Sequence, residues 1–568
     1  MTSMPARSLW TDLSEVVRPD TVLHTPMREV THHPFERVLA DAERTAGGLL
    51  PRLSRTDRPR IGLLMANGEP WVRGLLAAAR LGGAAVPIAL PVAFPGFDTY
   101  QAHVRKIAAD AGLAAVLVDR TTDRFASRLA DALPDVPFVD ITEVPAGPVS
   151  RDLGGPGSSD DLAVIQYTSG STSAPKGVAL TNANVAAGLA SLADGVDWSA
   201  EDDVMGQWVP LFHDMGLFLM LSAFARGSSV CLWRPSDFVR DTKGWLAGFS
   251  ASPATAMPAP NFAFDYMVDA IADGAPEGLD LSKWRVAYNA AEPVHQRTID
   301  RFEAAFTPYG FRPETMLPSY GMAEATLVAT YSDLHSRPKS VLVDRYALGT
   351  GESIRQVGPE ATEARAVVCV GRAVPGLRVR VGDGDRPVPD GTVGEVQLHG
   401  PAVMGGYLNL PAEEQPFTTD GWLRTGDLAF ALDGEFYIVG RLKDMIVIRG
   451  QNYYPEDVEE IVRQIPGVDR RHCAAMGVTD PAGTAGDERI AVLLETSLEG
   501  DEAAELVARI KKEIVTRLGF DSVDVVSVAP RSIPFTSSGK VKRQQAKQMY
   551  LQGRITDPQR AGTEGAKA

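Results

Sequence analysis

A chain of 568 residues is too long for one compact core, so we expect two or more domains. Hydrophobic residues make up 44% of the chain and charged residues 23%, which is typical of a soluble globular protein. The net charge of −16 argues against nucleic acid as the main partner.

Cysteine spacing and the apolar runs exclude further classes of protein. Cys231, Cys369 and Cys473 lie far apart without metal-ligand spacing, so we expect reduced core thiols in a cytoplasmic protein. The first 17 residues lack the apolar segment of a secretory signal. The strongest apolar run, residues 216–225, is too short to span a bilayer, so we expect no membrane span.

The first third of the chain alternates short apolar strands with amphipathic helices. The sequence "RIGLLMA" at residues 60–66 predicts a buried strand, and residues 69–82 a helix. Further strands are predicted at residues 84–90 and 113–119. This alternation indicates parallel βαβ units and an α/β fold. A glycine-rich linker at residues 154–161 leads into a strand that runs straight into a polar loop.

After about residue 335 the pattern changes to alternating β-branched residues with Gly, Pro and Asp turns, which predicts an antiparallel, barrel-like segment. Beyond a break near residue 440 we expect a small α+β unit, with a helix from Pro455, a strand at residues 489–496 and a long helix at residues 501–519. The predicted domains are therefore residues 1–440 and 441–552, followed by a polar tail at 553–568.

The polar loop "YTSGSTSAPKG", residues 167–177, offers backbone N–H groups, hydroxyls and one lysine, which suit a polyphosphate. It is not a Walker A loop, because Lys176 is followed by glycine rather than by a Ser or Thr that could hold Mg²⁺. Taken alone, the loop fits a polar surface turn equally well.

Five later motifs carry polar residues, and three of them have an ordinary structural alternative. His213 and Asp214 lie between apolar flanks, as a core or surface pair would. Tyr320 and Glu324 fit a base-stacking ring and a metal ligand, or a capped helix start. Asp427 lies on a turn and fits ribose hydroxyls or a plain turn. The last two motifs are "GRLKD" at residues 440–444 and "SSGK" at residues 537–540.

Together and in this order, these motifs resemble those of the adenylate-forming superfamily of acyl-CoA synthetases, adenylation domains and luciferases. The resemblance runs from about residue 35 to residue 550. The sequences "WVPLFHDMGL", "LPSYGMAEATLV" and "RGQNYYPEDVE" are most similar to those of fatty acyl-AMP ligases. Residues 341–376 look like the insertion that marks those ligases, whose members pass the acyl group to a carrier-protein phosphopantetheine rather than to free CoA.

The resemblance implies a reaction and a set of site residues. A carboxylic acid would attack ATP to give an acyl-adenylate, with Mg²⁺ on Glu324 and, as a further candidate ligand, Thr172. Lys540 would be the catalytic lysine of a mobile small domain, Lys443 the hinge, and His213 a neighbour of the acyl carbonyl. The implied ATP and AMP site comprises Thr168, Ser169, Gly170, Ser171, Thr172, Lys176, Asn289, Ala290, Ala291, Glu292, Ser319, Tyr320, Gly321, Met322, Ala323, Asp427 and Arg441.

Two features depart from the family pattern. Ser173 stands where the phosphate loop usually carries glycine, which strains the loop if that position needs a positive φ. Bulky residues also stand where long-chain relatives tend to have glycine. The expected acyl pocket is lined by Phe218, Leu219, Met220, Met257, Ala259 and Asn261. If these side chains meet the substrate, the pocket is shorter than a long fatty chain requires.

The sequence therefore favours an ATP-dependent acyl-AMP ligase that loads a phosphopantetheinylated acyl carrier protein in lipid, polyketide or other natural-product biosynthesis. One alternative is an acyl-CoA ligase, which would acylate free CoA. A second alternative is a catalytically silent nucleotide-binding homologue, which only Ser173 supports.

Overall fold

The computed structural model describes residues 8–26, 30–91, 94, 96–147, 157–168, 175–448, 451–466, 468, 473–479, 488–519, 523–536 and 540–555. The described residues include 157–161 of the predicted linker and 553–555 of the predicted tail, and the other residues of both segments lie outside them. In the described residues no helix is both long and apolar enough to cross a membrane. The three cysteines are buried and free, as predicted.

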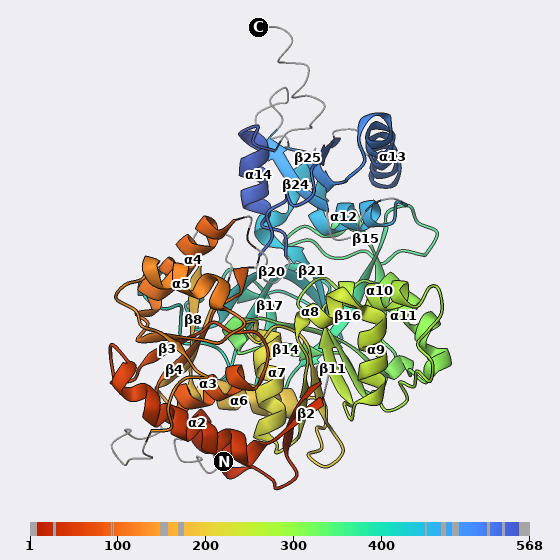
Figure 1. Ribbon diagram of the computed structural model, residues 1–568. Helices are drawn as coiled ribbons and strands as arrows, with labels where there is room; N and C mark the ends of the chain where they lie inside the picture. The colour runs from red at the N-terminus through yellow and green to blue at the C-terminus, as the bar shows by residue number, and fades with distance from the viewer. Residues whose placement is uncertain are drawn as a thin grey trace.

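A six-stranded sheet near the N-terminus confirms the predicted βαβ units (Figure 1). Its strand order is β6-β5-β3-β4-β7-β8, and all neighbours are parallel except β7 and β8. The strands are β3 (Arg60–Leu63), β4 (Ala84–Pro87), β5 (Ala115–Val118), β6 (Phe138–Asp140), β7 (Leu162–Thr168) and β8 (Lys176–Thr181). The helices of this region are α1 (Leu9–Glu15), α2 (Phe35–Leu49), α3 (Glu69–Arg80), α4 (Phe97–Ala111) and α5 (Asp123–Ala132).

A second sheet of fifteen strands forms the middle of the molecule. Its parallel half contains β1 (Val22–Pro26), β9 (Met205–Gln207), β10 (Val230–Leu232), β11 (Ala256–Ala259), β12 (Val286–Asn289) and β13 (Met316–Gly321), with β2 (Val30–Pro34) antiparallel at the edge. The accompanying helices are α6 (Asn182–Asp194), α7 (Asp214–Ala225), α8 (Pro235–Arg240), α9 (Thr242–Ala251), α10 (Asn261–Ala270) and α11 (Gln296–Phe306). Buried apolar side chains of both sheets join in one core cluster.

The antiparallel half of this sheet corresponds to the predicted barrel-like segment. It contains β14 (Val328–Tyr331), β15 (Ser340–Asp344), β16 (Ala364–Ala373), β17 (Arg378–Asp383), β18 (Arg386–Pro387), β19 (Gly394–His399), β20 (Leu423–Leu432) and β21 (Glu435–Arg441). Antiparallel pairing is confirmed, but the described strands continue the large sheet in an open row instead of closing on themselves. Strands β15 and β16 pair as the two arms of the expected insertion.

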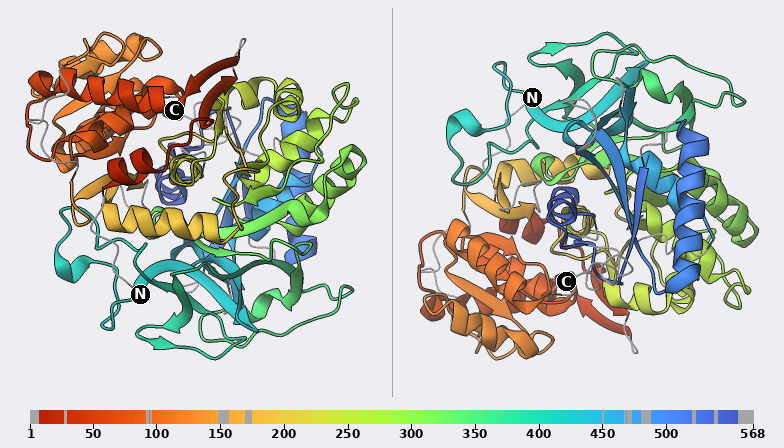
Figure 2. Two further views of the ribbon diagram at one scale, coloured as in Figure 1. Left: turned by 90° about the horizontal axis from the view of Figure 1, so that it is seen from below. Right: turned by 90° about the horizontal axis from the view of Figure 1, so that it is seen from above.

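The C-terminal unit lies above the two sheets in the view of Figure 1, and Figure 2 shows the same arrangement from below and from above. It contains β22 (Ile446–Ile448), β23 (Gln451–Tyr453), α12 (Pro455–Arg463), β24 (Cys473–Thr479), β25 (Glu488–Glu495), α13 (Gly500–Leu518), β26 (Val523–Val528) and α14 (Arg543–Leu551). The expected helices and strand are present, and two apolar clusters belong to this unit. Tyr454, however, packs with residues of the β15–β21 region, and its hydroxyl donates to Leu348 O at 2.7 Å.

Candidate active site

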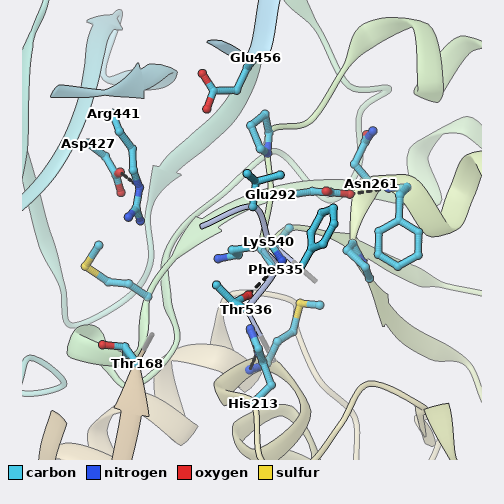
Figure 3. A pocket seen from close by; sticks show the side chains of 18 of the residues that line it. Thr168, His213, Asn261, Glu292, Asp427, Arg441, Glu456, Phe535, Thr536 and Lys540 are labelled. Atoms are coloured by element: carbon cyan, nitrogen blue, oxygen red, sulfur yellow. Dashed lines mark hydrogen bonds and ion pairs between the residues drawn. The ribbon is translucent and has the colours of Figure 1, made fainter. Parts of the chain in front are cut away.

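A cavity of about 2600 Å³ opens between the two sheets and the C-terminal unit (Figure 3). Its walls include the carboxyl ends of β7, β12 and β13, where loops follow buried strands. Such strand ends are the usual ligand sites of α/β sheets. Lys540 of the C-terminal unit reaches into the same cavity.

Asp427 is fixed by two partners. It faces Arg441 across the antiparallel strands β20 and β21, and Arg441 Nε lies 3.0 Å from Asp427 Oδ1. The Tyr320 hydroxyl donates to Asp427 Oδ2 at 2.8 Å. The carboxylate raises the pKa of Arg441 above its ordinary value. This held carboxylate lines the cavity and retains lone pairs for hydroxyl groups such as those of a ribose.

Most of the residues that the resemblance assigned to the nucleotide line the cavity. Those that do are Thr168, Lys176, Ala290, Ala291, Glu292, Ser319, Tyr320, Gly321, Met322, Ala323, Asp427 and Arg441. Ala291 has a φ of 71°, a left-handed conformation that costs a non-glycine residue on the order of 1 kcal/mol and often marks functional loops. Ser169, Gly170, Ser171, Thr172 and Ser173 lie outside the described residues.

Asn289 departs from this expectation. It is fully buried at the end of β12 and does not line the cavity, whereas Tyr288 before it does. Successive side chains of a strand point to opposite faces, so only one of this pair can face the cavity. Asn289 Nδ2 donates to Asn261 Oδ1 at 3.3 Å, which ties β12 to the start of α10.

Glu324 follows β13 in the 3₁₀ turn Ala323–Ala325 and is held by a residue that the sequence analysis did not name. The Tyr407 hydroxyl donates to Glu324 Oε1 at 2.6 Å, and Lys176 Nζ lies 4.9 Å from the centre of the Tyr407 ring. Desolvation raises the pKa of Glu324. Apart from its place after Gly405 and Gly406, nothing in the sequence marks Tyr407.

The donor set fits a magnesium ion carried by its substrate. The described residues contain no group of three or more His, Cys, Asp or Glu side chains arranged for a metal. Mg²⁺ usually binds through one or two carboxylates together with substrate phosphates and water. The Glu324 carboxylate, with Lys176 near the ring of the same Tyr407 that holds it, matches that pattern.

His213 and Asp214 lie where α7 begins, and both line the cavity. His213 is at the bottom of the view in Figure 3. His213 Nδ1 lies 2.5 Å from Asp214 Oδ1, and the Met215 N–H donates to the same oxygen at 2.7 Å. Burial alone would raise the pKa of Asp214, but His213, Lys540 and the Met215 N–H together lower it below its ordinary value. Asp214 therefore stays ionised and orients the imidazole.

Lys540 is held by a small loop. The Thr536 N–H donates to Lys540 O at 2.7 Å, and the Lys540 N–H donates to Thr536 Oγ1 at 3.0 Å. The side chain extends into the cavity between Glu292 and His213 (Figure 3). Desolvation lowers the pKa of Lys540, and the Arg441 guanidinium acts in the same direction. Lys443, in the turn Leu442–Asp444, also lines the cavity, and desolvation lowers its pKa.

The expected acyl pocket divides into two groups. Leu219 and Asn261 line the cavity, and Met215, one helical turn before Leu219, does so as well. The residues that are buried and do not line it are Phe218, Met220, Met257 and Ala259. Helix α7 is buried on nearly all sides and β11 on both faces, so these four side chains pack in the core. Trp208, Tyr288 and Tyr331, which the sequence analysis did not name, line the cavity instead.

Comparison with known proteins agrees with this geometry. The family model described as AMP-binding enzyme matches residues 17–408. The long-chain-fatty-acid–AMP ligase FadD26 of Mycobacterium marinum is 31% identical over 86% of this chain and 87% of that protein. The chain belongs to the AMP-binding enzyme family. It is an adenylate-forming ligase similar to fatty acyl-AMP ligases, as the motifs predicted.

Other AMP-binding enzymes extend the comparison. The putative fatty-acid–CoA ligase FadD21 of Mycobacterium tuberculosis is 32% identical over 87% of this chain and 88% of that protein. A solved structure from work on fatty acyl-adenylate ligases of E. coli and L. pneumophila superposes with a TM-score of 0.87 at 28% identity, covering 97% of this chain and 100% of that one. A fatty acyl-adenylate ligase from L. pneumophila in complex with acyl adenylate and pyrophosphate gives a TM-score of 0.72 at 27% identity, with 96% of each chain covered.

Arg543 is a further residue of this AMP-binding enzyme that the sequence analysis did not identify. Its guanidinium contacts Glu459, lies 2.8 Å from Glu456 Oε1 and has its Nε 3.8 Å from Asp444 Oδ2. These three carboxylates come from α12 and from the turn that contains Lys443. Arg543 thus ties the start of α14, and the neighbouring loop of Lys540, to the turn of Lys443.

Proposed function

We propose that this enzyme joins a carboxylic acid to ATP and then transfers the acyl group to the phosphopantetheine thiol of an acyl carrier protein. In the first half, a carboxylate oxygen bonds to the α-phosphorus and pyrophosphate leaves. In the second half, the thiol sulfur bonds to the acyl carbon, AMP leaves and the thiol proton passes to solvent. The observation that carries the proposal is the convergence of Lys540, Asp427 and Arg441 on one cavity.

The geometry supports a role for each of these residues. Asp427, held by Tyr320 and Arg441, would accept hydrogen bonds from both ribose hydroxyls. Lys176, close to the Tyr407 ring, would neutralise the phosphates that we expect the loop at 168–177 to bind. Lys540 would stabilise the charge that develops when two anions meet, for which a compact ammonium on a flexible stem is suited.

Magnesium, when bound on Glu324, would neutralise phosphate charge and help to align the leaving pyrophosphate. The Tyr407 hydroxyl would orient the carboxylate of Glu324 for that role. His213, oriented by Asp214 at the start of α7, would lie beside the acyl carboxylate.

Support for a carrier-protein acceptor comes from residues 341–376 and from the relatives named AMP ligases. In the structure this segment contacts the C-terminal unit, because the Tyr346 hydroxyl donates to Leu518 O at 3.0 Å. The competing function is acyl transfer to CoA, which the name of the relative FadD21 favours.

Acid-dependent exchange of labelled pyrophosphate into ATP, measured over a panel of acids, tests the first half. Mass spectrometry of the product mixture should then find acyl-adenylate. Adding either a phosphopantetheinylated carrier protein or CoA separates the two acceptors. We expect acylated carrier and little acyl-CoA; rapid, saturable acyl-CoA formation at micromolar CoA would favour the competing function, and no exchange with any acid would reject both.

A further inference from the structure

Two buried tyrosines line the cavity, and their hydroxyl groups are not used by the proposed chemistry. Tyr288 lies on β12 and Tyr331 at the end of β14, and the two residues are 2% and 7% exposed. The Tyr331 hydroxyl is enclosed without a hydrogen-bond partner, and the Tyr288 hydroxyl likewise bonds to no other described residue. Because the large majority of buried side-chain polar atoms have a partner, two such hydroxyls on one wall point to a missing ligand.

The register of the large sheet places both tyrosines on one face. Tyr288 pairs with Leu317 of β13, and Tyr331 pairs with Ser319 of the same strand. Residues two apart on a strand share a face, and so do paired residues of neighbouring strands, so the two tyrosines on either side of β13 point the same way. Their ring centroids lie 5.9 Å apart. Ser319 also lines the cavity, which identifies this face as the cavity face.

The Tyr331 ring is held in place by close packing against α6. A methyl group on Gly195, at the end of that helix, would lie 2.7 Å from Cδ2 and 2.8 Å from Cε2 of the ring, closer than carbon atoms pack. Desolvation raises the pKa of both tyrosines, and Tyr288 raises that of Tyr331 further. Both hydroxyls keep their protons near neutral pH, so each can donate a hydrogen bond as well as accept one.

The tyrosine pair lies deeper in the sheet than the groups that we expect at the reacting carboxylate. Lys540 extends into the cavity between Glu292 and His213 (Figure 3). Glu292 follows the end of β12, whereas Tyr288 lies within that strand. An acid whose carboxylate lies at Lys540 therefore reaches Tyr288 and Tyr331 only with the part of its acyl group that is distant from the carboxylate.

The two strands that carry the tyrosine pair bring no charged side chain to the cavity. The residues of β12 and β14 that line it are Tyr288, Val328 and Tyr331. Arg285 and Asp203, the charged groups that act on the pKa of Tyr288, pair with each other at 2.6 Å, and neither lines the cavity. A carboxylate buried here would lack a cation, whereas a hydroxyl or carbonyl oxygen needs only a hydrogen bond. The pair therefore suits a neutral oxygen.

We propose that Tyr288 and Tyr331 bind a neutral oxygen on the acyl group, so that the preferred substrates are hydroxy or keto acids rather than plain hydrocarbon acids. This inference rests on the proposed function for the reaction of the carboxylate. A hydrocarbon acyl group that displaces water from this wall leaves both hydroxyls unpaired, whereas a substrate oxygen replaces the lost hydrogen bonds. A site of this kind discriminates against the analogue that lacks the oxygen.

Pyrophosphate exchange with matched acids tests the proposal in the full-length enzyme. Benzoic acid is compared with its meta- and para-hydroxy derivatives, and straight-chain acids with their hydroxy and keto derivatives. We expect kcat/KM to be at least about tenfold higher for the best oxygenated acid than for its plain partner, the effect of a hydrogen bond left unmade. Tyr331→Phe and Tyr288→Phe should each reduce this ratio to less than about threefold. Equal kcat/KM values in every matched pair would overturn the proposal.

Two controls separate this inference from other causes. Tyr309→Phe removes a hydroxyl from a tyrosine that does not line the cavity, so it should leave the ratio unchanged. A dicarboxylic acid should react more slowly than the hydroxy acid of the same length, and a faster reaction would overturn the neutral oxygen. Exchange that is equal for plain and oxygenated acids rejects this inference and leaves the proposed function intact, whereas no exchange with any acid rejects the proposed function itself.

Discussion

The Tyr320 hydroxyl donates to one oxygen of Asp427 at 2.8 Å, and Arg441 Nε lies 3.0 Å from the other oxygen. Tyr320 lies on β13 of the parallel half of the large sheet, whereas Asp427 and Arg441 lie on β20 and β21 of the antiparallel half. The Asp427 carboxylate therefore lies beside the carboxyl end of β13. The carboxylate is therefore oriented before any nucleotide arrives. Preorganisation of this kind lowers the cost of ordering the site on binding.

Tyr320→Phe should raise the KM for ATP about tenfold and change kcat by less than about threefold, because it keeps the ring and removes one hydrogen bond to a charged group. Pyrophosphate exchange at varied ATP concentration measures both constants. Tyr309→Phe, at a tyrosine that does not line the cavity, is the matched control. An unchanged KM for ATP would show that Arg441 alone holds Asp427.

Lys540→Ala should reduce acid-dependent pyrophosphate exchange by about 10²-fold or more while ATP still binds, because Lys540 acts on charge that develops in the transition state. ATP binding is measured separately by calorimetry. Lys547→Ala removes an ammonium from α14 that pairs with Glu488 outside the cavity, so it should exchange at nearly the wild-type rate. Near-normal exchange by Lys540→Ala would remove this lysine from the mechanism.

Lys443→Pro should spare adenylation and slow acyl transfer, because proline fixes φ at the turn where we expect the C-terminal unit to pivot. Single-turnover assays measure the two halves separately: pyrophosphate release for the first, and loading of a carrier protein from preformed acyl-adenylate for the second. Leu442→Ala, in the same turn, controls for loss of a side chain. Equal losses in both halves would reject the hinge assignment.

His103→Gln should make the protein less sensitive to acid. The pKa of His103 is about 4 in the folded chain and about 6.5 when unfolded, so between these values the unfolded chain binds the additional proton. Stability therefore falls as pH falls through this window, by up to about 1.4 kcal/mol per pH unit. The apparent melting temperature at pH 7 and pH 5, without phosphate, should differ less for His103→Gln than for the wild type. An identical difference would show that His103 is solvated.

The fold could be predicted largely from local patterns. The runs at residues 60–66, 84–90 and 113–119 contain the strands β3, β4 and β5, because a strand buried on both faces leaves an uninterrupted apolar signal. Local patterns could not show whether the later antiparallel strands close into a barrel or remain open. Pairing of β14 with β13 joins them to the large sheet, and such long-range pairing leaves no mark on local alternation.

The site was predictable where the family motifs name its residues, as at Asp427 and Lys540. Side-chain direction was not predictable from proximity in the sequence. Phe218 and Leu219 are adjacent on α7, yet only Leu219 lines the cavity. The sequence could not distinguish the two, because this apolar helix is buried on both faces and therefore shows no amphipathic pattern. Tyr407 contacts Glu324, which lies 83 positions earlier in the sequence. Arg543 contacts Glu459 and Asp444, which lie 84 and 99 positions earlier. Contacts over such distances leave no local pattern in the sequence.

Acid preference offers the last prediction. Leu219 and the three aromatic side chains Trp208, Tyr288 and Tyr331 line the cavity, so we expect the wild type to adenylate short, medium or compact cyclic acids best. Chains of about twelve carbons or more should react poorly, because forcing extra methylenes into a packed wall costs about 1–3 kcal/mol.

Leu219→Gly should move this optimum toward longer chains, since each additional methylene that gains a buried place contributes about 0.8 kcal/mol. Phe218→Gly is the matched control: it places the same helix-weakening glycine one position earlier, on a side chain that packs in the core. It should lower the melting temperature and leave the ranking of acids unchanged. Pyrophosphate exchange rates over a series of straight-chain acids measure the chain-length preference of the wild type and of both variants. A wild type that prefers long chains, together with a Leu219→Gly variant of unchanged ranking, would show that the acyl group lies elsewhere in the cavity.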